Sequence, residues 1–212
     1  MLWEDLDFGA ACSPARGRYW KERAETEPAA LLRGAACLIT VAENTEVKKE
    51  SLAAAQSARQ LATTATGRWP GSAVAHYLLA YSTALVAERR PLQALSLVPQ
   101  VEQQALRAAA LDPAIHDGGP YRMLAELYLR APGFPLSIGD GELAVEYFYK
   151  AVAQSPEHLE NRLGLVEALL EERDFGAACR ELAHGWPLLA PDDRKGPWDR
   201  ALDLQHRLCG GL

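Results

Sequence analysis

The sequence predicts an all-α fold in which antiparallel helix pairs stack into a right-handed solenoid. Long stretches with a helical apolar pattern alternate with short breaks rich in proline and glycine. The composition is 49% hydrophobic but only 8% aromatic, and much of the apolar part is alanine. Small side chains let helix backbones approach closely, so this composition favours helices that stack on one another.

The stretch 118–156 has the residue spacing of a tetratricopeptide repeat (TPR), a pair of antiparallel helices. We therefore expect a TPR-like right-handed α-solenoid of about four helix pairs plus a C-terminal capping helix, in a single domain over 1–212. The turn inside 118–156 is longer than a standard repeat turn. The signature positions are Leu124, Ala125 and Tyr128 in the first helix, then Ala144, Phe148, Ala151 and Pro156 in and after the second.

The N-terminal part, residues 1–28, is predicted to hold a partial helix. The hexapeptide Asp-Phe-Gly-Ala-Ala-Cys at 7–12 recurs at 174–179, where it opens the second helix of a repeat. Residues 7–27 are thus expected to form the second helix of an incomplete pair. Pro14 opposes this expectation, because a proline inside a helix removes a hydrogen-bond donor and clashes with the preceding turn.

Helix-pair repeats are expected over 29–190. The first pair consists of helices at 29–43 and 47–67, and the second of helices at 73–88 and 93–111. Pro99 is expected to kink or restart the last of these helices near its beginning.

After a loop at 112–119, Pro120 is predicted to occupy the first position of the next helix, where its missing N–H costs nothing. The final pair is expected at 157–173 and from about Ala178 to Trp186. The apolar and polar faces of 191–212 predict the capping helix. Small residues at the helix crossings are predicted to be buried, namely Ala80, Ala125, Ala144 and Ala178.

Charge and hydropathy exclude several function classes. The net charge is -6, and lysine and arginine are scattered, so no nucleic-acid partner is expected. No apolar run reaches the ~18 residues that a membrane span needs. The N-terminus has three acidic residues and lacks the apolar segment of a signal peptide, so the chain as given is expected in the cytoplasm.

The four cysteines show no metal-binding spacing. Cys12, Cys37, Cys179 and Cys209 form no C-x2-C pair, and no suitable histidine pair accompanies them, so a zinc site is not expected. Three of them lie beside alanine or leucine in apolar stretches and are interpreted as small buried hydrophobic residues. A disulfide stays open at this point, because pairing depends on distances.

No catalytic constellation is apparent. Asp112, His116 and Asp117 lie in a turn and match no ligand motif, so they are interpreted as a solvated loop with an Asp capping a helix. Gly139-Asp140 is interpreted as a turn and helix N-cap rather than a phosphate loop. Without a Ser-His-Asp or Cys-His arrangement, we expect a non-enzyme that needs no cofactor or metal.

Polar residues on two first helices could line a groove. Tyr121 and Arg122 occupy the place that Asn161 and Arg162 occupy one repeat later. Two stacked guanidinium groups could hold a carboxylate, since their geometry matches carboxylates. The alternative is that the arginines pair with neighbouring glutamates such as Glu126 and Glu160. Further glutamates on these helices make the groove too acidic for an acidic C-terminal peptide.

The overlong turn is unusual because it is apolar. Phe134, Leu136 and Ile138 fall where loops are normally polar. These side chains could fill the groove, or they could form one wall of a pocket for a ligand or partner. The sequence does not decide between the two, and we take Phe134 and Leu136 as candidate contact residues together with Tyr121, Arg122, Asn161 and Arg162.

Several of these segments resemble a known family. The stretches that carry the resemblance are Leu111-Asp112-Pro113, Gly118-Gly119-Pro120-Tyr121-Arg122, Ala131-Pro132-Gly133-Phe134-Pro135 with Ser137-Ile138-Gly139-Asp140, Lys150-Ala151-Val152, and Asn161-Arg162-Leu163. Together they resemble the T-component (TatT-like) family of tripartite ATP-independent periplasmic (TRAP) transporters. The resemblance is specific over about 95–170 and weaker over 29–94.

The resemblance implies a bacterial TPR-like solenoid that assists TRAP-type solute uptake. Its partner would be the substrate-binding subunit of the transporter, with a small organic or hydrophobic ligand in the groove and assembly into homo-oligomers. It also implies a periplasmic lipoprotein, which would require an N-terminus longer than the sequence given. The alternative function is a general TPR adaptor for protein–protein interaction in the cytoplasm.

Overall fold

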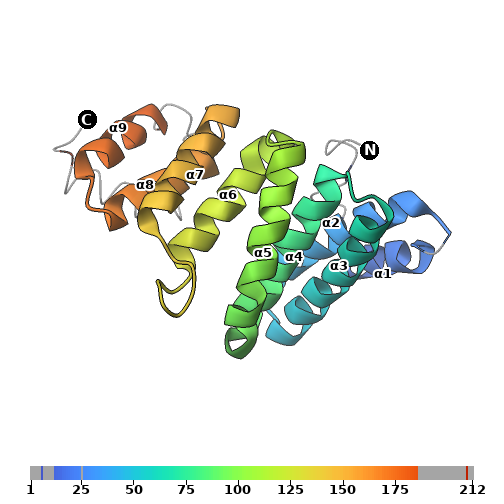
Figure 1. Ribbon diagram of the computed structural model, residues 1–212. Helices are drawn as coiled ribbons and strands as arrows, with labels where there is room; N and C mark the ends of the chain where they lie inside the picture. The colour runs from blue at the N-terminus through green and yellow to red at the C-terminus, as the bar shows by residue number, and fades with distance from the viewer. Residues whose placement is uncertain (1–5, 7–11, 25, 186–208, 210–212) are drawn as a thin grey trace. The chain divides into compact units, whose positions relative to one another are not determined.

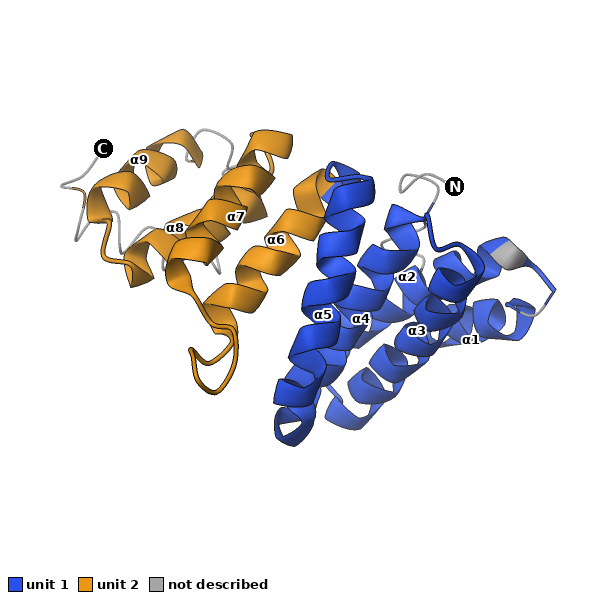
Figure 2. Cartoon of the chain, in the orientation of Figure 1, with its two compact units in different colours: residues 1–116 blue, residues 117–212 orange. Residues whose placement is uncertain are grey.

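The fold is all-helical throughout the part of the chain that the computed structural model describes, which is residues 6, 12–24, 26–185 and 209 (Figure 1). The chain divides into two compact units, Met1–His116 and Asp117–Leu212 (Figure 2). Each unit is built from antiparallel helices, which are joined by short turns except at the longer loop between Arg130 and Gly141. The predicted all-α class is therefore correct, and it follows from the alternation of apolar helical stretches with short breaks.

The described part of unit 1 contains α1 followed by two helix pairs. Its helices are α1 (Pro14–Arg23), α2 (Pro28–Asn44), α3 (Lys48–Arg68), α4 (Ala73–Arg89) and α5 (Pro91–Leu111). α2 packs on α3 and α4 packs on α5, as paired helices should. α2 also packs on α4, and α3 on α1 and α4, so each pair covers the apolar face of the next.

Unit 2 contains the pair with the long turn and the pair that follows it. Its helices are α6 (Ile115–Arg130), whose first two residues belong to unit 1, α7 (Gly141–Gln154), α8 (Leu159–Glu171) and α9 (Phe175–Gly185). α8 packs against both α7 and α9. The capping helix expected at 191–212 lies outside the described residues except for Cys209.

The repeat spacing places small residues at the helix crossings. Ala80, Ala125, Ala144 and Ala178 are all buried, as predicted. The signature residues Leu124, Tyr128, Phe148 and Ala151 are buried as well. Such close crossings bury apolar surface in both units with few aromatic side chains.

Prolines and polar caps determine where the helices begin. Ser13 caps α1 through its hydroxyl, which accepts from the backbone N–H of Arg16, and Pro14 takes the first helical position. Within the helix expected at 7–27, the described part is helical over Pro14–Arg23, and residues 7–11 lie outside the described residues. Ser72 and Asp140 cap α4 and α7 in the same way.

Two other prolines behave differently from expectation. α5 runs from Pro91 to Leu111 as one helix through Pro99, so the helix does not restart there, and the alternative, a kink at Pro99, stays a prediction. α6 begins at Ile115, and Pro120 lies inside it rather than at its first position. The difference has a local cause, since His116, Asp117 and Gly118 have φ of 49°, 56° and 78°, which is the left-handed region. The right-handed backbone of α6 thus starts only after Gly118, close to Pro120.

The cysteines form two groups. Cys179 on α9 forms a disulfide with Cys209, with their Cα atoms 5.7 Å apart. The interpretation of Cys179 as a small buried hydrophobic residue is therefore wrong. Cys37 on α2 is fully buried, as that interpretation requires, and Cys12 packs against its cluster.

Candidate functional site

Three tyrosines in unit 2 form a row between α6 and α7. The ring of Tyr147 lies 6.1 Å from Tyr121 and 5.6 Å from Tyr128, and it stacks nearly parallel on Tyr128. Lys150 places its ammonium group 4.5 Å from the Tyr147 ring centroid. Tyr121 is half-buried in this row, so it packs against Tyr147 and is still partly exposed.

The loop between α6 and α7 exposes two large apolar side chains. Phe134 is 92% exposed and Leu136 is 72% exposed. They therefore neither fill a groove nor lie tucked against the helices. Filling of the groove therefore does not hold for Phe134 and Leu136, whereas Ile138 is half-buried. The other interpretation, one wall of a pocket for a ligand or partner, stays a prediction.

This loop is nevertheless held in one backbone conformation. The N–H of Gly139 donates to the carbonyl of Pro132 at 2.9 Å, and the N–H of Asp140 donates to the carbonyl of Tyr128 at 3.0 Å. The N–H of Leu136 donates to the carbonyl of Gly133 at 3.1 Å inside the loop. A Cβ at Gly139 would lie 2.0 Å from the carbonyl oxygen of Ala131, so only glycine fits there. The backbone thus presents Phe134 and Leu136 from a built loop.

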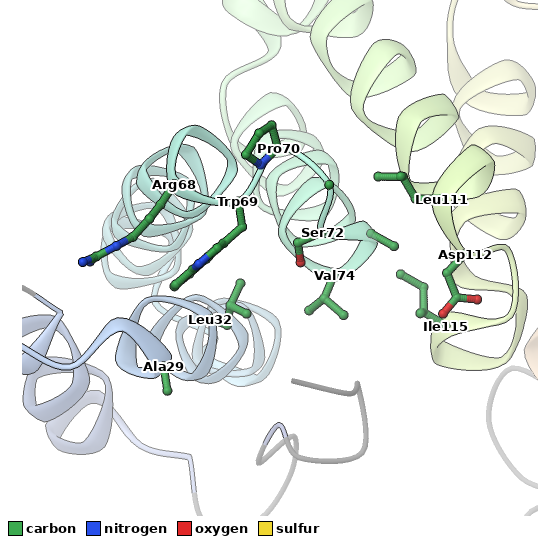
Figure 3. A pocket seen from close by; sticks show the side chains of 12 residues that line it. Ala29, Leu32, Arg68, Trp69, Pro70, Ser72, Val74, Leu111, Asp112 and Ile115 are labelled. Carbon is green, nitrogen blue, oxygen red and sulfur yellow. The ribbon is translucent and has the colours of Figure 1, made fainter.

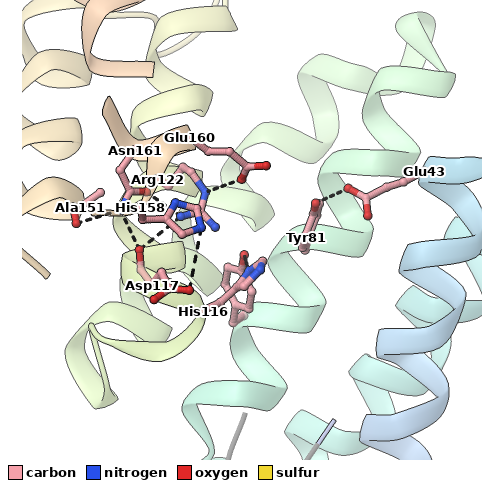
Figure 4. A network of polar contacts seen from close by, with 10 residues as sticks. Glu43, Tyr81, His116, Asp117, Arg122, Ala151, His158, Glu160 and Asn161 are labelled. Carbon is pink, nitrogen blue, oxygen red and sulfur yellow. Dashed lines mark hydrogen bonds and ion pairs between the residues drawn. The ribbon is translucent and has the colours of Figure 1, made fainter. Parts of the chain in front are cut away.

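Two of the candidate residues, Arg122 and Asn161, meet in a partly buried polar network (Figure 4). Arg122 donates to the Oδ1 of Asn161 at 2.6 Å and to the carbonyl of Asp117 at 3.3 Å. Asn161, which is fully buried, donates from Nδ2 to the carbonyls of Asp117 and Ala151 at 2.8 and 3.0 Å. Every polar atom of the Asn161 side chain therefore serves the packing of α8 on the preceding helices.

Arg162 has different partners from Arg122. It donates from Nη1 to Glu181 at 2.7 Å and from Nε to the carbonyl of Pro156 at 2.7 Å. Arg122 instead has a longer contact of 3.9 Å with Glu160. The two guanidinium groups thus contact different glutamates, Glu181 for Arg162 and Glu160 for Arg122.

A second ion network, which the sequence reasoning missed, connects α6 to α8. Arg130 contacts Glu126 at 3.0 Å and Glu167 at 3.0 Å. Burial raises the pKa of Glu126, although the charge of Arg130 opposes the rise. The four-residue spacing of Glu126 and Arg130 on one helix was the available signal.

His158 is a second residue that sequence reasoning missed. Its Nδ1 is buried without a hydrogen-bond partner among the described residues, and its Nε2 lies 3.9 Å from the carboxylate of Asp117. Burial, and then the charge of Arg122, lowers its pKa below the usual value. Asp117 and Glu160 act in the opposite direction. A position just before a helix gave no sequence signal for such burial.

Unit 1 contains a cleft of about 860 Å³ at the ends of its helices (Figure 3). The turn at 69–72 forms one side, with Arg68 beside Trp69. Leu32 and Val74 contribute apolar surface, and Leu111, Asp112 and Ile115 line the opposite part. The turn at 69–72 could be predicted from the sequence, but the cleft could not, because the residues that line the cleft come from helices far apart in the chain.

The acidic and histidine side chains of 112–117 do not gather. Asp112 accepts from the N–H of Ala114 at 3.1 Å, and His116 contacts the hydroxyl of Tyr77 at 2.7 Å. Asp117 contacts Ser155 at 3.2 Å. Within the described part of the chain, no group of three His, Cys, Asp or Glu side chains is arranged to hold a metal ion. Every described helix is also too short or too polar to cross a membrane.

No family model matches the sequence, and no curated protein matches it either. Among solved structures, the chain is similar to a thermophilic TPR protein from Thermus thermophilus, with a TM-score of 0.54. The match covers 93% of this chain and 98% of that chain at 15% sequence identity. This likeness confirms the TPR-like α-solenoid fold that the helix-pair spacing predicts.

Proposed function

We propose that this protein is a non-enzymatic adaptor that binds a protein partner through the loop at 131–140. The observation that carries the proposal is the exposure of Phe134 and Leu136 on a loop whose backbone is fixed by its own hydrogen bonds. Exposed apolar side chains on an ordered segment favour partner binding, because the ordering entropy is already spent. The TPR-like fold supports the proposal, since repeat solenoids offer extended binding surfaces.

The charges on α6 and α8 narrow the chemistry of the partner. These two helices carry five carboxylates and three arginines. The carboxylates are Asp117, Glu126, Glu160, Glu167 and Glu171, and the arginines are Arg122, Arg130 and Arg162. Each arginine already contacts a glutamate. A partner segment with apolar and basic side chains therefore fits better than an acidic C-terminal peptide.

Among the candidate residues, we assign direct contact to Phe134, Leu136 and the half-buried Tyr121. Arg122, Asn161 and Arg162 are assigned a supporting role, because each is engaged with neighbouring helices. This division follows the burial of the side chains. Truncating a direct contact should weaken binding without weakening the fold.

The finer proposal is an accessory role in TRAP-type solute uptake, with the substrate-binding subunit as the partner. The resemblance of the 111–163 segments to T-components supports it. The disulfide between Cys179 and Cys209 supports it independently, because such bonds persist in oxidising compartments such as the periplasm. A small hydrophobic ligand and homo-oligomers are part of the same proposal. The coarser alternative is a TPR adaptor with a cytoplasmic partner.

The test is capture of partners from the source cells with tagged wild-type protein and with a Phe134→Ser/Leu136→Ser variant. Leu92→Ser is the matched control, because Leu92 on α5 is a fully exposed leucine outside the loop. We expect wild type and control to retain a partner that the loop variant loses. Equal capture by all three proteins would contradict the adaptor proposal at this loop.

The identity of the captured protein distinguishes the role in TRAP-type transport from the general adaptor role. A TRAP substrate-binding subunit, identified by mass spectrometry, supports the transport role. Recovery of a loop-dependent cytoplasmic partner would exclude the transport role and leave the adaptor role standing.

A further inference from the structure

The two cysteines outside the C-terminal disulfide lie together in unit 1. Cys37 is fully buried in a cluster with Trp20 and Ala30, and the half-buried Cys12 packs against this cluster. Both are reduced thiols in this structure.

Close helix packing holds the two thiols in place. A Cβ at Gly17 of α1 would lie 2.5 Å from Leu38, the residue after Cys37. A Cβ at Gly34 of α2 would lie 3.1 Å from Trp20. Glycine at both positions therefore lets α1 lie directly against α2, and Cys12 immediately precedes Ser13, which caps α1. The close packing of α1 on α2 thus places Cys12 near Cys37.

We infer that Cys12 and Cys37 form a second disulfide when the protein meets a small-molecule disulfide oxidant such as oxidised glutathione. Unit 1 would then carry one covalent bond and unit 2 the other, and the segment before α1 would be tied to α2. This assigns a redox modification site to the N-terminal end of the described fold.

The two thiols have different roles in this reaction. Burial, followed by the hydrogen bond with Cys12, raises the pKa of Cys37 to about 12, so Cys37 is a poor first nucleophile. Cys12, which is accessible, attacks oxidised glutathione as its thiolate, and the glutathione S–S bond breaks with release of one glutathione thiolate. Cys37 then loses its proton and attacks the Cys12 sulfur, which releases the second glutathione. Two protein thiols are oxidised, and one oxidised glutathione is reduced to two thiols.

The test uses the full chain, first reduced and then equilibrated over a series of ratios of reduced to oxidised glutathione. Remaining thiols are alkylated, and peptides are mapped by mass spectrometry without reduction. We expect a peptide that joins Cys12 to Cys37, with loss of both alkylated thiols, in wild type and in a Cys179→Ser/Cys209→Ser variant. Full alkylation of Cys12 and Cys37 at ratios where Cys179–Cys209 has formed would overturn the inference.

A second variant tests the order of the two steps. In Cys37→Ala, Cys12 should accumulate as a mixed disulfide with glutathione, while wild type should hold little of this species. Equal amounts in both proteins would show that Cys37 does not resolve the intermediate and would also overturn the inference. If Cys37→Ala fails to fold by circular dichroism, the mapping of wild type and the double serine variant decides the question.

Discussion

Gly164 of α8 lies directly against the ring of Phe148 of α7. A Cβ added at Gly164 would come within 2.1 Å of the ring atom Cε1 of Phe148, which no relaxed packing permits. Phe148 is itself fully buried, so its ring has little space into which it can move. The absence of a side chain at 164 thus sets how closely α8 can approach α7.

Gly164→Ala should therefore destabilise the protein, by roughly 1–3 kcal/mol, because the ring or the helix must shift to admit a methyl group. Gly67→Ala is the matched control, since Gly67 is also helical but has nothing within 4 Å of its added Cβ. The control should be neutral or stabilising by up to about 1 kcal/mol, as alanine favours helices over glycine. Urea unfolding of both variants measures the difference, and equal stabilities would contradict this packing.

Asn161→Leu should cost roughly 2–4 kcal/mol, because the carbonyls of Asp117 and Ala151 would lose their buried donor. Arg122 would lose an acceptor at the same time. Asn44→Leu is the control, since Asn44 is exposed and donates only to Thr40 on its own helix. A loss for Asn161→Leu no larger than that of the control would show that the network does not stabilise unit 2.

His158 should make stability depend on pH. Its pKa is lowered in the folded protein, so the unfolded chain takes up a proton first as the pH falls below the usual histidine value of about 6.5. The contribution of His158 is therefore complete above that value and is lost as the pH falls through the folded pKa. Arg122, Asp117 and Glu160 are the charged groups that influence the imidazole.

The measurement is the free energy of unfolding of wild type and His158→Gln between about pH 7.5 and about pH 5. The advantage of wild type over the variant should shrink as the pH falls. A wild-type advantage that grows toward low pH would reverse the sign argued here.

Reduction of the Cys179–Cys209 bond should destabilise unit 2 by about 3 kcal/mol, since the bond closes a loop over a sequence separation of 30. Cys179→Ala/Cys209→Ala should unfold at the same urea concentration as the reduced wild type. It should also be insensitive to added reductant when Cys12 and Cys37 are in the reduced state. Equal stability of oxidised and reduced wild type would show that the bond adds nothing to the fold.

Most helix positions could be predicted because each apolar stretch has a visible start and stop. The predicted helix at 29–43 corresponds to Pro28–Asn44, and that at 73–88 to Ala73–Arg89. The start of α6 was missed because it depends on left-handed backbone at His116 and Asp117, residue types that do not require it. The Cys179–Cys209 pairing depends on a distance, which spacing alone does not provide.

The sequence could predict the apolar loop of the candidate site, but it could not predict the role of the polar residue Asn161. Phe134 and Leu136 could be selected as candidate contact residues because apolar residues are rare in loops. Both side chains are exposed, as contact with a partner requires. Asn161 looked like a groove residue, yet it is buried, because a polar side chain on a first helix can serve either the groove or the packing. Only the position of Ala151 and Asp117 decides between the two.

In the loop at 131–140, the residues that determine the backbone conformation differ from the residues that expose apolar side chains. Gly139 and the hydrogen bonds to Pro132 and Tyr128 determine the path of the chain, whereas Phe134 and Leu136 take no part in the helix core. Substitutions at 134 and 136 should thus be nearly free of folding cost. The loop could serve as a site for diversified libraries, in which new binding specificities are selected on an unchanged helical scaffold.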